Sequence, residues 1–216
     1  FDDKNFDIYG VNNEFHRLPE KFAVSVSEGV AENARCPAGG RIRFITNSKN
    51  IHIKTIMKNT RGIGFDLFRS ENGSEIFAAA FRKPECFICN GDFEASAAVS
   101  KNNETYSYTL NFPYFGEIEG FKLGIDEGAI LGNGAKYSNE KPVAFYGSSI
   151  TQGAWVTRPG SAYISMISQK YNLNYLNFGF AGSAKGETSL AYDIELLKAT
   201  HLDMYKTVRK YKPNIP

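Results

Sequence analysis

Apolar residues alternate with charged and polar residues over much of the first half of the chain. Residues 41–46 read Arg-Ile-Arg-Phe-Ile-Thr, and residues 51–56 read Ile-His-Ile-Lys-Thr-Ile. A period of two predicts antiparallel strands with one face toward a core and one face in water. Because no convincing long helix interrupts them, these strands predict a β-sandwich or jelly roll. Further strands are expected at residues 64–69, 75–81, 105–112 and 120–125, with a hairpin turn at Glu71-Asn72-Gly73.

The period changes after residues 131–142, a polar and turn-rich stretch that we interpret as a linker or loop. Residues 143–146 suit a short strand of a buried parallel sheet, and residues 161–171 have helical spacing. A second strand is expected at residues 174–178 and a last helix at about residues 196–211. The order strand, helix, strand, helix predicts an α/β domain with parallel strands.

These patterns together predict two domains. An all-β sandwich or jelly roll over residues 1–138 precedes an α/β domain over residues 139–216. The length of 216 residues fits this division, and 42% hydrophobic residues are enough to form real cores. The 25 basic and 23 acidic side chains leave a net charge of +2, which gives no reason to expect a nucleic-acid or membrane-surface partner. No apolar run approaches the ~20 residues that span a bilayer.

The three cysteines give no sign of a metal site. Cys86 and Cys89 form a Cys-x-x-Cys pair with Cys36 as a distant third thiol, so a structural zinc site lacks its fourth ligand. The pair also lacks the βαβ context of a thioredoxin-like redox site. We interpret all three as core or loop cysteines.

The candidate catalytic motif of the chain is Gly147-Ser148-Ser149-Ile150-Thr151. It follows the strand at residues 143–146, which places a serine at the carboxyl edge of the sheet, where open α/β folds bind ligands. A second glycine-rich loop, residues 179–187, follows the next strand. Adjacent parallel strands bring the two loops together, so that amides from both can converge on one negative oxygen. On the residues alone, a plain capped turn is an equally open interpretation.

Nucleotide sites fit these two loops less well. Residues 147–153 lack the lysine of a phosphate-binding P-loop. The loop from Gly179 to Gly182 does not complete a dinucleotide fingerprint. Neither kind of site is favoured.

Several motifs taken together carry a resemblance to a known family. Residues 145–153, Arg158-Pro159-Gly160 and residues 177–187 resemble the blocks of the SGNH/GDSL hydrolase superfamily, which implies a flavodoxin-like α/β hydrolase domain. Gly64-Phe65-Asp66-Leu67-Phe68 resembles the Gly-x-Asp-Leu-Tyr motif of an N-terminal β domain, with Phe in place of Tyr. His16-Arg17-Leu18-Pro19 and residues 38–44 are also similar to that domain. The chain thus resembles bacterial GDSL-like lipase/acylhydrolases that carry this β domain.

The resemblance implies roles for individual residues. Ser149 matches the nucleophile, and its backbone N–H matches the first oxyanion donor. Gly182 matches the glycine of the second block, whose N–H is the next donor. Ser148 stands where the superfamily often has Asp. Arg158 and Lys185 either line the acyl or alcohol pocket or are solvated loop charges.

Two blocks of the superfamily are not visible in the chain. The third block supplies an oxyanion asparagine, of which Tyr192-Asp193-Ile194 is at most a remnant, and the Asp-x-x-His block supplies the general base. We expect that segments are missing, because a sheet of two strands could not bury both of its faces. His201 is then a helix residue beside Leu197 and Tyr205 rather than the base, and His16 and His52 belong to the β domain.

The expected function is that of a serine esterase that removes short acyl groups, such as acetyl groups, from a carbohydrate or similar ester. A small-molecule or glycan ester is the expected partner, with no metal or cofactor. The alternatives are a carbohydrate-binding or adhesion module with a non-catalytic hydrolase-like half, and a lipase for long acyl chains. Because the chain opens at Phe1 and resembles bacterial enzymes, a secreted or periplasmic protein that has lost its signal peptide is one expectation.

Overall fold

The computed structural model describes residues 6–61, 64–83, 85–139 and 141–186 of the chain. The helix expected at about residues 196–211, with His201 in it, and the segment Tyr192-Asp193-Ile194 lie outside the described residues. Within the described ranges, no helix combines the length and the apolar content that crossing a membrane requires.

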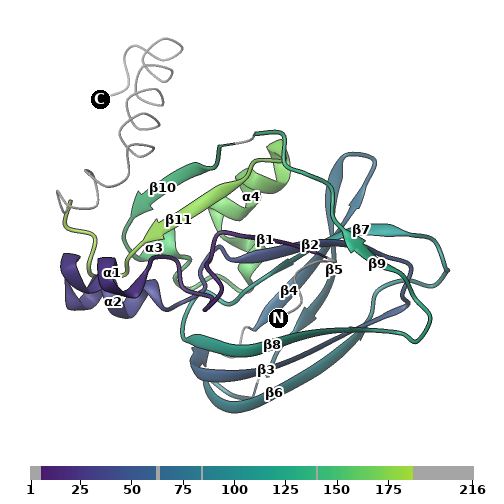
Figure 1. The fold of residues 1–216 in the computed structure, drawn as a ribbon, viewed down its shortest axis with the longest axis horizontal. Coiled ribbons are helices and arrows are strands. Elements are labelled where there is room, and N and C mark those ends of the chain that lie inside the picture. The colour runs from purple at the N-terminus through teal and green to yellow at the C-terminus, as the bar shows by residue number, and fades with distance from the viewer. Residues whose placement is uncertain (1–5, 62–63, 84, 140, 187–216) are drawn as a thin grey trace, which may run out of the picture.

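Two antiparallel sheets form the first part of the molecule, as the alternating pattern predicts (Figure 1). The strands of one sheet are, from edge to edge, β1 (Asp7–Tyr9), β2 (Arg41–Thr46), β7 (Tyr106–Asn111), β4 (Phe65–Glu71) and β5 (Ser74–Phe81), and β9 (Leu131–Asn133) also pairs with β2. The strands of the other are, in order, β6 (Ile88–Ala98), β3 (Asn50–Arg61) and β8 (Glu117–Ile125). The β-sandwich prediction is confirmed.

The core between the two sheets is built from alternate residues of the strands. Ile42 and Phe44 of β2 are fully buried in one cluster with Ile51 and Ile53 of β3. Burying one such side chain stabilises the fold by roughly 1.5–3 kcal/mol, so the apolar half of the alternating pattern is what holds the sheets together.

The other half of the pattern behaves differently in the two strands. In β3, His52 and Lys54 face water, as expected. In β2, Arg41 and Arg43 are only 1% and 3% exposed. The prediction that this face of β2 is exposed to water is therefore wrong. The polar face of β2 is covered by the second part of the chain, which no local pattern could indicate.

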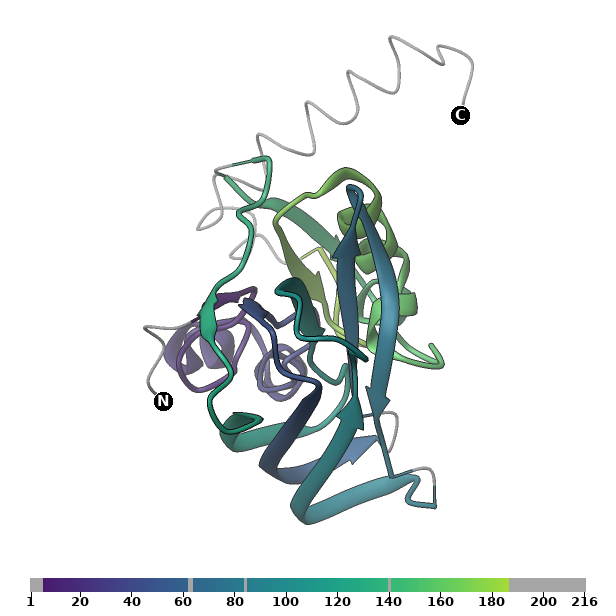
Figure 2. The same cartoon turned by 90° about the vertical axis from the view of Figure 1, so that its right-hand side faces the viewer.

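The second part contains two parallel strands, as predicted. β10 (Val143–Gly147) pairs with β11 (Tyr175–Gly179) from end to end. Between them lie α3 (Ser149–Gln152), a 3-10 turn η2 (Pro159–Ser161) and α4 (Tyr163–Tyr171). Figure 2 shows this green segment against the strands of the larger sheet. The sequence predicts α4 to within two residues but not the short helix α3.

Two helices near the N-terminus were not expected from the sequence. α1 (Glu20–Val26) and α2 (Glu28–Ala34) lie beside the ends of β10 and β11 (Figure 1). Ser27 caps α2, because its side chain accepts a hydrogen bond from the N–H of Val30 at 3.2 Å. Each helix has seven residues, which is too short for a strong periodic signal.

These helices cover one face of the parallel pair. Val30 of α2 packs in one cluster with Ala144 of β10 and Phe178 of β11. On the opposite face, Ile164 of α4 packs in a cluster with Tyr175. The expectation that two strands could not bury both faces is therefore wrong for β11, whereas β10 stays half-exposed.

The stretch at residues 131–142 is more than a linker. Its first residues form β9, and Tyr137 contacts the buried guanidinium of Arg41. The expectation of a simple linker or loop is therefore wrong for the described residues. The cysteines are core or loop residues, as expected: Cys86 lies in the turn before β6, Cys89 is buried in the sandwich core and Cys36 is a buried free thiol. Cys86 and Cys89 are also joined as a disulfide, which the sequence analysis does not predict.

Two buried arginines of the first part hold the two ends of β11. Arg41 donates to the carbonyl of Tyr175 at 3.3 Å and to the side-chain oxygen of Asn174 at 2.7 Å, and its guanidinium lies 3.9 Å from the centre of the Tyr175 ring. Arg17 donates to the carbonyls of Asn177 at 3.0 Å and Gly179 at 2.5 Å. Strand β11 is thus attached to the first part at both ends.

Arg17 is held entirely inside the protein. Its other donors reach the carbonyls of Cys36 and Asn33 at the end of α2, where carbonyl groups lack helical partners and favour a cation. Burial lowers the pKa of Arg17 to about 10, so the guanidinium remains charged at neutral pH. The central carbon of the guanidinium (Cζ) also lies 5.0 Å from the centre of the Phe180 ring.

We expect Arg17→Met to lower the free energy of unfolding by about 3 kcal/mol or more, because several buried carbonyls lose their donor at once. Arg17→Lys should lose less, since an ammonium still donates but lacks the planar fork. Urea denaturation measures both values. Lys54→Met, at an exposed ion pair with Glu94, is the control and should change stability by less than about 0.5 kcal/mol. A loss below about 1 kcal/mol for Arg17→Met would contradict this role.

Candidate active site

The two loops predicted to meet lie side by side. Strand β10 ends at Gly147, whose carbonyl accepts a hydrogen bond from the N–H of Phe180 at 2.9 Å. The N–H of Gly182 donates to the hydroxyl of Ser148 at 3.4 Å. The serine turn and the glycine loop therefore share one edge of the parallel pair.

Ser149 is the first residue of α3 and is half-buried. Among the described residues, its hydroxyl has no hydrogen-bond partner and its N–H donates to no backbone carbonyl. The first backbone hydrogen bond of the helix runs from the N–H of Gln152 to the carbonyl of Ser148 at 3.0 Å. N–H groups in the first turn of a helix lack intrahelical acceptors, so the N–H of Ser149 can donate to a bound oxygen.

Glycines allow the close approach of α3 to the strand ends. A Cβ at Gly147 would lie 2.3 Å from the hydroxyl oxygen of Thr151. A Cβ at Gly179 would lie 2.1 Å from the backbone nitrogen of Gln152. A side chain at Gly179 would require the backbone of α3 to move, and one at Gly147 would displace the Thr151 side chain, which explains why both strands end in glycine.

Gln152 holds the glycine loop against α3. Its side chain is fully buried, accepts the N–H of Ala181 at 2.9 Å and donates to the carbonyl of Tyr114 at 3.2 Å. Asn177 adds a second brace, because its side chain donates to the carbonyl of Gln152 at 3.3 Å and accepts the N–H of Gly179 at 2.8 Å. Neither residue was predicted from the sequence to have a role in the site, although Gln152 lies beside the serine motif.

The first part of the chain supports the same loop from the other side. Asn33 of α2 donates to the carbonyl of Ala181 at 3.3 Å. A Cβ at Gly29 would lie 2.2 Å from the hydroxyl oxygen of Ser183. Together with Arg17, these contacts fix the loop around Gly182 from residues more than a hundred positions away in the sequence.

Arg158 lies at the boundary with the sandwich rather than in the serine turn. Its Nε is 3.8 Å from the carboxylate of Asp66, and its guanidinium lies over the Phe77 ring at 4.4 Å. Asp66 is fully buried and accepts the N–H of Gly160 at 2.7 Å and the side-chain amide of Asn111 at 2.9 Å. The aspartate of the Gly-x-Asp-Leu motif thus organises the segment at residues 158–160.

Lys185 is exposed, and the neighbouring Gly186 donates its N–H to the hydroxyl of Tyr146 at 2.7 Å. His16 lies 3.5 Å from Glu14, and His52 lies 2.6 Å from the hydroxyl of Ser96, so both histidines contact residues of the first part. The described part of the chain holds no group of three or more His, Cys, Asp or Glu side chains that could bind a metal ion.

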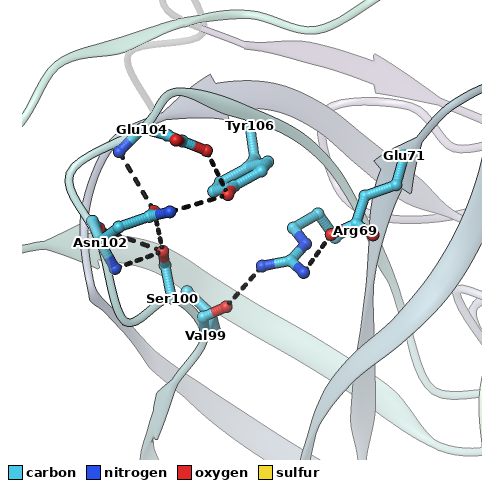
Figure 3. Close-up of polar contacts among 7 residues, drawn as sticks. All are labelled: Arg69, Glu71, Val99, Ser100, Asn102, Glu104 and Tyr106. Carbon is cyan, nitrogen blue, oxygen red and sulfur yellow. Dashed lines mark hydrogen bonds and ion pairs between the residues drawn. The ribbon is translucent and has the colours of Figure 1, made fainter.

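A hollow on the sandwich is lined by Arg69, Tyr106 and the loop at residues 98–102. Figure 3 shows that its polar groups bond to one another. The hydroxyl of Tyr106 donates to Glu104 at 2.7 Å, and Arg69 donates to the carbonyl of Val99 at 3.4 Å. Because the polar groups of this hollow are paired with one another, whereas the hydroxyl of Ser149 has no partner among the described residues, the serine turn is the better candidate.

Asp66 makes stability depend on pH. Burial raises its pKa to about 6, although the N–H of Gly160, Asn111 and Arg158 favour the charged form. A pKa that is higher in the folded state than in the unfolded state contributes stability at low pH, and this contribution is lost as pH rises through about 6.

The free energy of unfolding, relative to that of Asp66→Asn, should therefore fall by about 2 kcal/mol between about pH 4 and about pH 7. Urea denaturation of both proteins across this range measures the difference. Because the wild type and Asp66→Asn share every other titrating group, the difference between their free energies of unfolding isolates the effect of Asp66. A difference that stays constant or rises with pH would show that the carboxylate is ionised throughout.

Gln152→Leu should lower the free energy of unfolding by about 1–3 kcal/mol, since it leaves two buried backbone groups unpaired. Hydrogen exchange at Ala181 and Gly182 should become faster, because the loop loses its brace. Gln152→Glu retains the acceptor for Ala181 and should protect these amides better than Leu does. Unchanged exchange at both amides in Gln152→Leu would mean that other contacts hold the loop.

Two family models match the chain. Residues 4–131 match GxDLY, described as the N-terminus of Esterase_SGNH_hydro-type, and residues 140–216 match the GDSL-like Lipase/Acylhydrolase family. The first match alone covers more than half of the chain. The chain belongs to the SGNH/GDSL hydrolases. No curated protein matches the sequence.

Solved structures show the same architecture as this SGNH/GDSL hydrolase chain. A protein assigned as a GDSL-like lipase from Bacteroides ovatus is 25% identical, with a TM-score of 0.78 over 98% of this chain and 70% of that one. A salicylyl-acyltransferase from a tetracycline biosynthetic pathway is 15% identical, with a TM-score of 0.64 over 83% of this chain and 52% of that one.

An acetyl xylan esterase from Butyrivibrio proteoclasticus is 14% identical, with a TM-score of 0.54 over 84% of this chain and 47% of that one. At these identities, the acyltransferase and the xylan esterase show the fold alone. This SGNH/GDSL hydrolase chain thus spans 70% of the first structure and about half of the other two.

Proposed function

We propose that the protein is a serine esterase that removes short acyl groups, such as acetyl groups, from a carbohydrate or similar ester. The observation that carries this proposal is the meeting of the Ser148-Ser149 turn with the Gly182 loop at the carboxyl edge of β10 and β11. Membership of the GDSL-like lipase/acylhydrolase family supports ester hydrolysis.

Ser149 is proposed as the nucleophile. Its oxygen attacks the ester carbonyl and its proton passes to a base outside the described residues, while the carbonyl oxygen becomes an anion. The N–H groups of Ser149 and Gly182 stabilise that anion, since both lie in the loops that meet here. When the carbonyl re-forms, the alcohol leaves with a proton from the base, and water then attacks the acyl-serine by the reverse steps.

Ser149 is favoured over Ser148 because of its surroundings. The hydroxyl of Ser148 already accepts the N–H of Gly182, at a long 3.4 Å. Within the described residues the hydroxyl of Ser149 has no such partner and stands at the first turn of α3. A nucleophile must approach the base and the carbonyl carbon freely, which fits Ser149 better.

The carbohydrate part of the proposal has separate support. The Butyrivibrio proteoclasticus protein of the same fold is named an acetyl xylan esterase. A β-sandwich beside a hydrolase site also suits glycan recognition, as an argument by analogy. Lys185, exposed in the glycine loop, is proposed to line the edge of the substrate pocket, and Arg158 is proposed to position the segment beside it.

The architecture of the whole protein is part of the same proposal. We place the domain boundary between residues 138 and 139 and expect β10 and β11 to belong to a larger flavodoxin-like sheet. The general-base histidine and the oxyanion asparagine then come from segments beyond those described. Residues 17–36 pack on β11, so the two domains share an interface.

The test is hydrolysis of p-nitrophenyl acetate by the full-length protein. Ser149→Ala should lower kcat by about a thousandfold or more, because the attacking oxygen is lost. Ser148→Ala is the matched control and should retain most of the activity. Both variants should keep the melting temperature of the wild type.

Four outcomes would contradict the proposal. Full activity of Ser149→Ala would remove Ser149 from the mechanism, and loss of activity in Ser148→Ala alone would assign the role to its neighbour. Absence of hydrolysis in the wild type, with oligosaccharide binding retained, would favour a binding module with a non-catalytic hydrolase half. Faster hydrolysis of long-chain than of acetyl esters would indicate a lipase.

A further inference from the structure

The glycine loop that follows β11 contains a β-turn. The N–H of Ser183 donates to the carbonyl of Phe180 at 2.9 Å, so Ala181 and Gly182 are the two central residues of the turn. Gly182 has a φ of 71°, whereas the φ of Ala181 is not positive. This combination is that of a type II turn. The central peptide group of the turn joins the carbonyl of Ala181 to the N–H of Gly182.

The direction of this peptide group is not fixed by the turn itself. Type I and type II turns differ by a rotation of the central peptide through about 180°. Glycine is compatible with both, because it adopts negative and positive φ about equally well. The rotation would turn the N–H of Gly182 away from Ser148, to whose hydroxyl it donates at 3.4 Å. A contact from outside the turn is therefore needed to select one orientation.

Asn33 of α2 supplies that contact. Its side-chain amide donates to the carbonyl of Ala181 at 3.3 Å and to the carbonyl of Gly29 at 2.7 Å, which uses both N–H groups of the amide. The carbonyl of Asn33 in turn accepts a hydrogen bond from Arg17. Among the described residues, no other donor contacts the carbonyl of Ala181. Because a peptide group is planar and trans, a fixed Ala181 carbonyl also fixes the Gly182 N–H, which points the opposite way.

Gln152 has a different task in the same loop. Its side chain accepts the N–H of Ala181 at 2.9 Å, and this N–H belongs to the preceding peptide group, between Phe180 and Ala181. A rotation of the central peptide leaves that contact intact but breaks the contact with Asn33. Gln152 therefore holds the loop against α3, and Asn33 selects the orientation of the central peptide.

We propose that Asn33 is a positioning residue for the reaction at Ser149. This inference rests on the proposed function, in which the N–H of Gly182 stabilises the anionic oxygen. Asn33 holds this N–H in place before the substrate binds, and donors that are already in place need no rearrangement when charge develops. The hydrogen bond to the Ala181 carbonyl also polarises the peptide group, which makes the Gly182 N–H a stronger donor. A residue of the first domain thus affects the rate without touching the substrate.

The first experiment measures hydrolysis of p-nitrophenyl acetate by full-length Asn33→Asp, which keeps the shape of the side chain but lacks its N–H groups. kcat should fall about tenfold or more, with KM within about twofold of the wild type, because the anion forms only in the transition state. Asn33→Ala, with a residue that favours helices, should lose a similar factor. Glu32→Gln, at the exposed neighbour on α2, is the matched control and should keep the wild-type kcat.

Inhibition by phenylboronic acid separates positioning from a structural effect. A boronic acid bound to the serine oxygen is a tetrahedral anion, so its affinity depends on the oxyanion donors, whereas KM does not. In Asn33→Asp the Ki of phenylboronic acid should rise by about the factor by which kcat/KM falls. The inference is overturned if kcat stays within about twofold of the wild type in both Asn33 variants, or if Ki stays constant while kcat falls.

The two proposals fail in different ways. Hydrolysis that depends on Ser149 but is indifferent to Asn33 would refute the positioning role and keep the esterase. A wild type that hydrolyses no ester would refute the esterase, and NMR of the protein labelled with ¹⁵N-glycine then tests Asn33. In Asn33→Asp the Gly182 signal should shift and broaden, because the peptide exchanges between two orientations. The signal of Gly73, in the turn between β4 and β5, is the control. An unchanged Gly182 signal would refute the role of Asn33.

Discussion

The position of the candidate active site depends on one buried cation. The guanidinium of Arg17 donates to the carbonyls of Asn177 and Gly179, at the point where β11 ends and the glycine loop begins. Each buried carbonyl without a donor would cost roughly 1–3 kcal/mol, and a planar fork can satisfy several at once. The distance between the Gly182 loop and Ser149 therefore follows from a residue of the first domain.

The same arrangement recurs around the site. Arg41 holds the start of β11, Asp66 holds the segment at residue 160, and Tyr114 accepts the side chain of Gln152. The β domain is thus part of the framework of the site and not an independent module beside it. Motif residues such as Arg17 and Asp66, which carry much of the family resemblance, lie at this interface, and their role is to place the residues that do the chemistry.

Much of this could be predicted from residues that are close in sequence. The alternation at residues 41–56, the Asn72-Gly73 turn and the two parallel strands each follow from a local period or a turn signal. The approach of Ser148 to Gly182 then follows from geometry, because parallel strands end at the same edge. Helices α1 and α2 could not be predicted in this way, since a seven-residue helix is stable only when another surface covers it.

What the sequence alone determined is most of the strands, though not β1, β6 or β9, together with the turn chemistry and the serine at the edge of the sheet. Only the tertiary structure decided that Arg41 and Arg43 are buried although their pattern matches that of a solvent-exposed face. A period of two shows that a strand has two different faces, but it cannot show what covers each face. A charged side chain can be buried where a distant segment supplies carbonyl groups and aromatic rings, and local sequence does not record that supply.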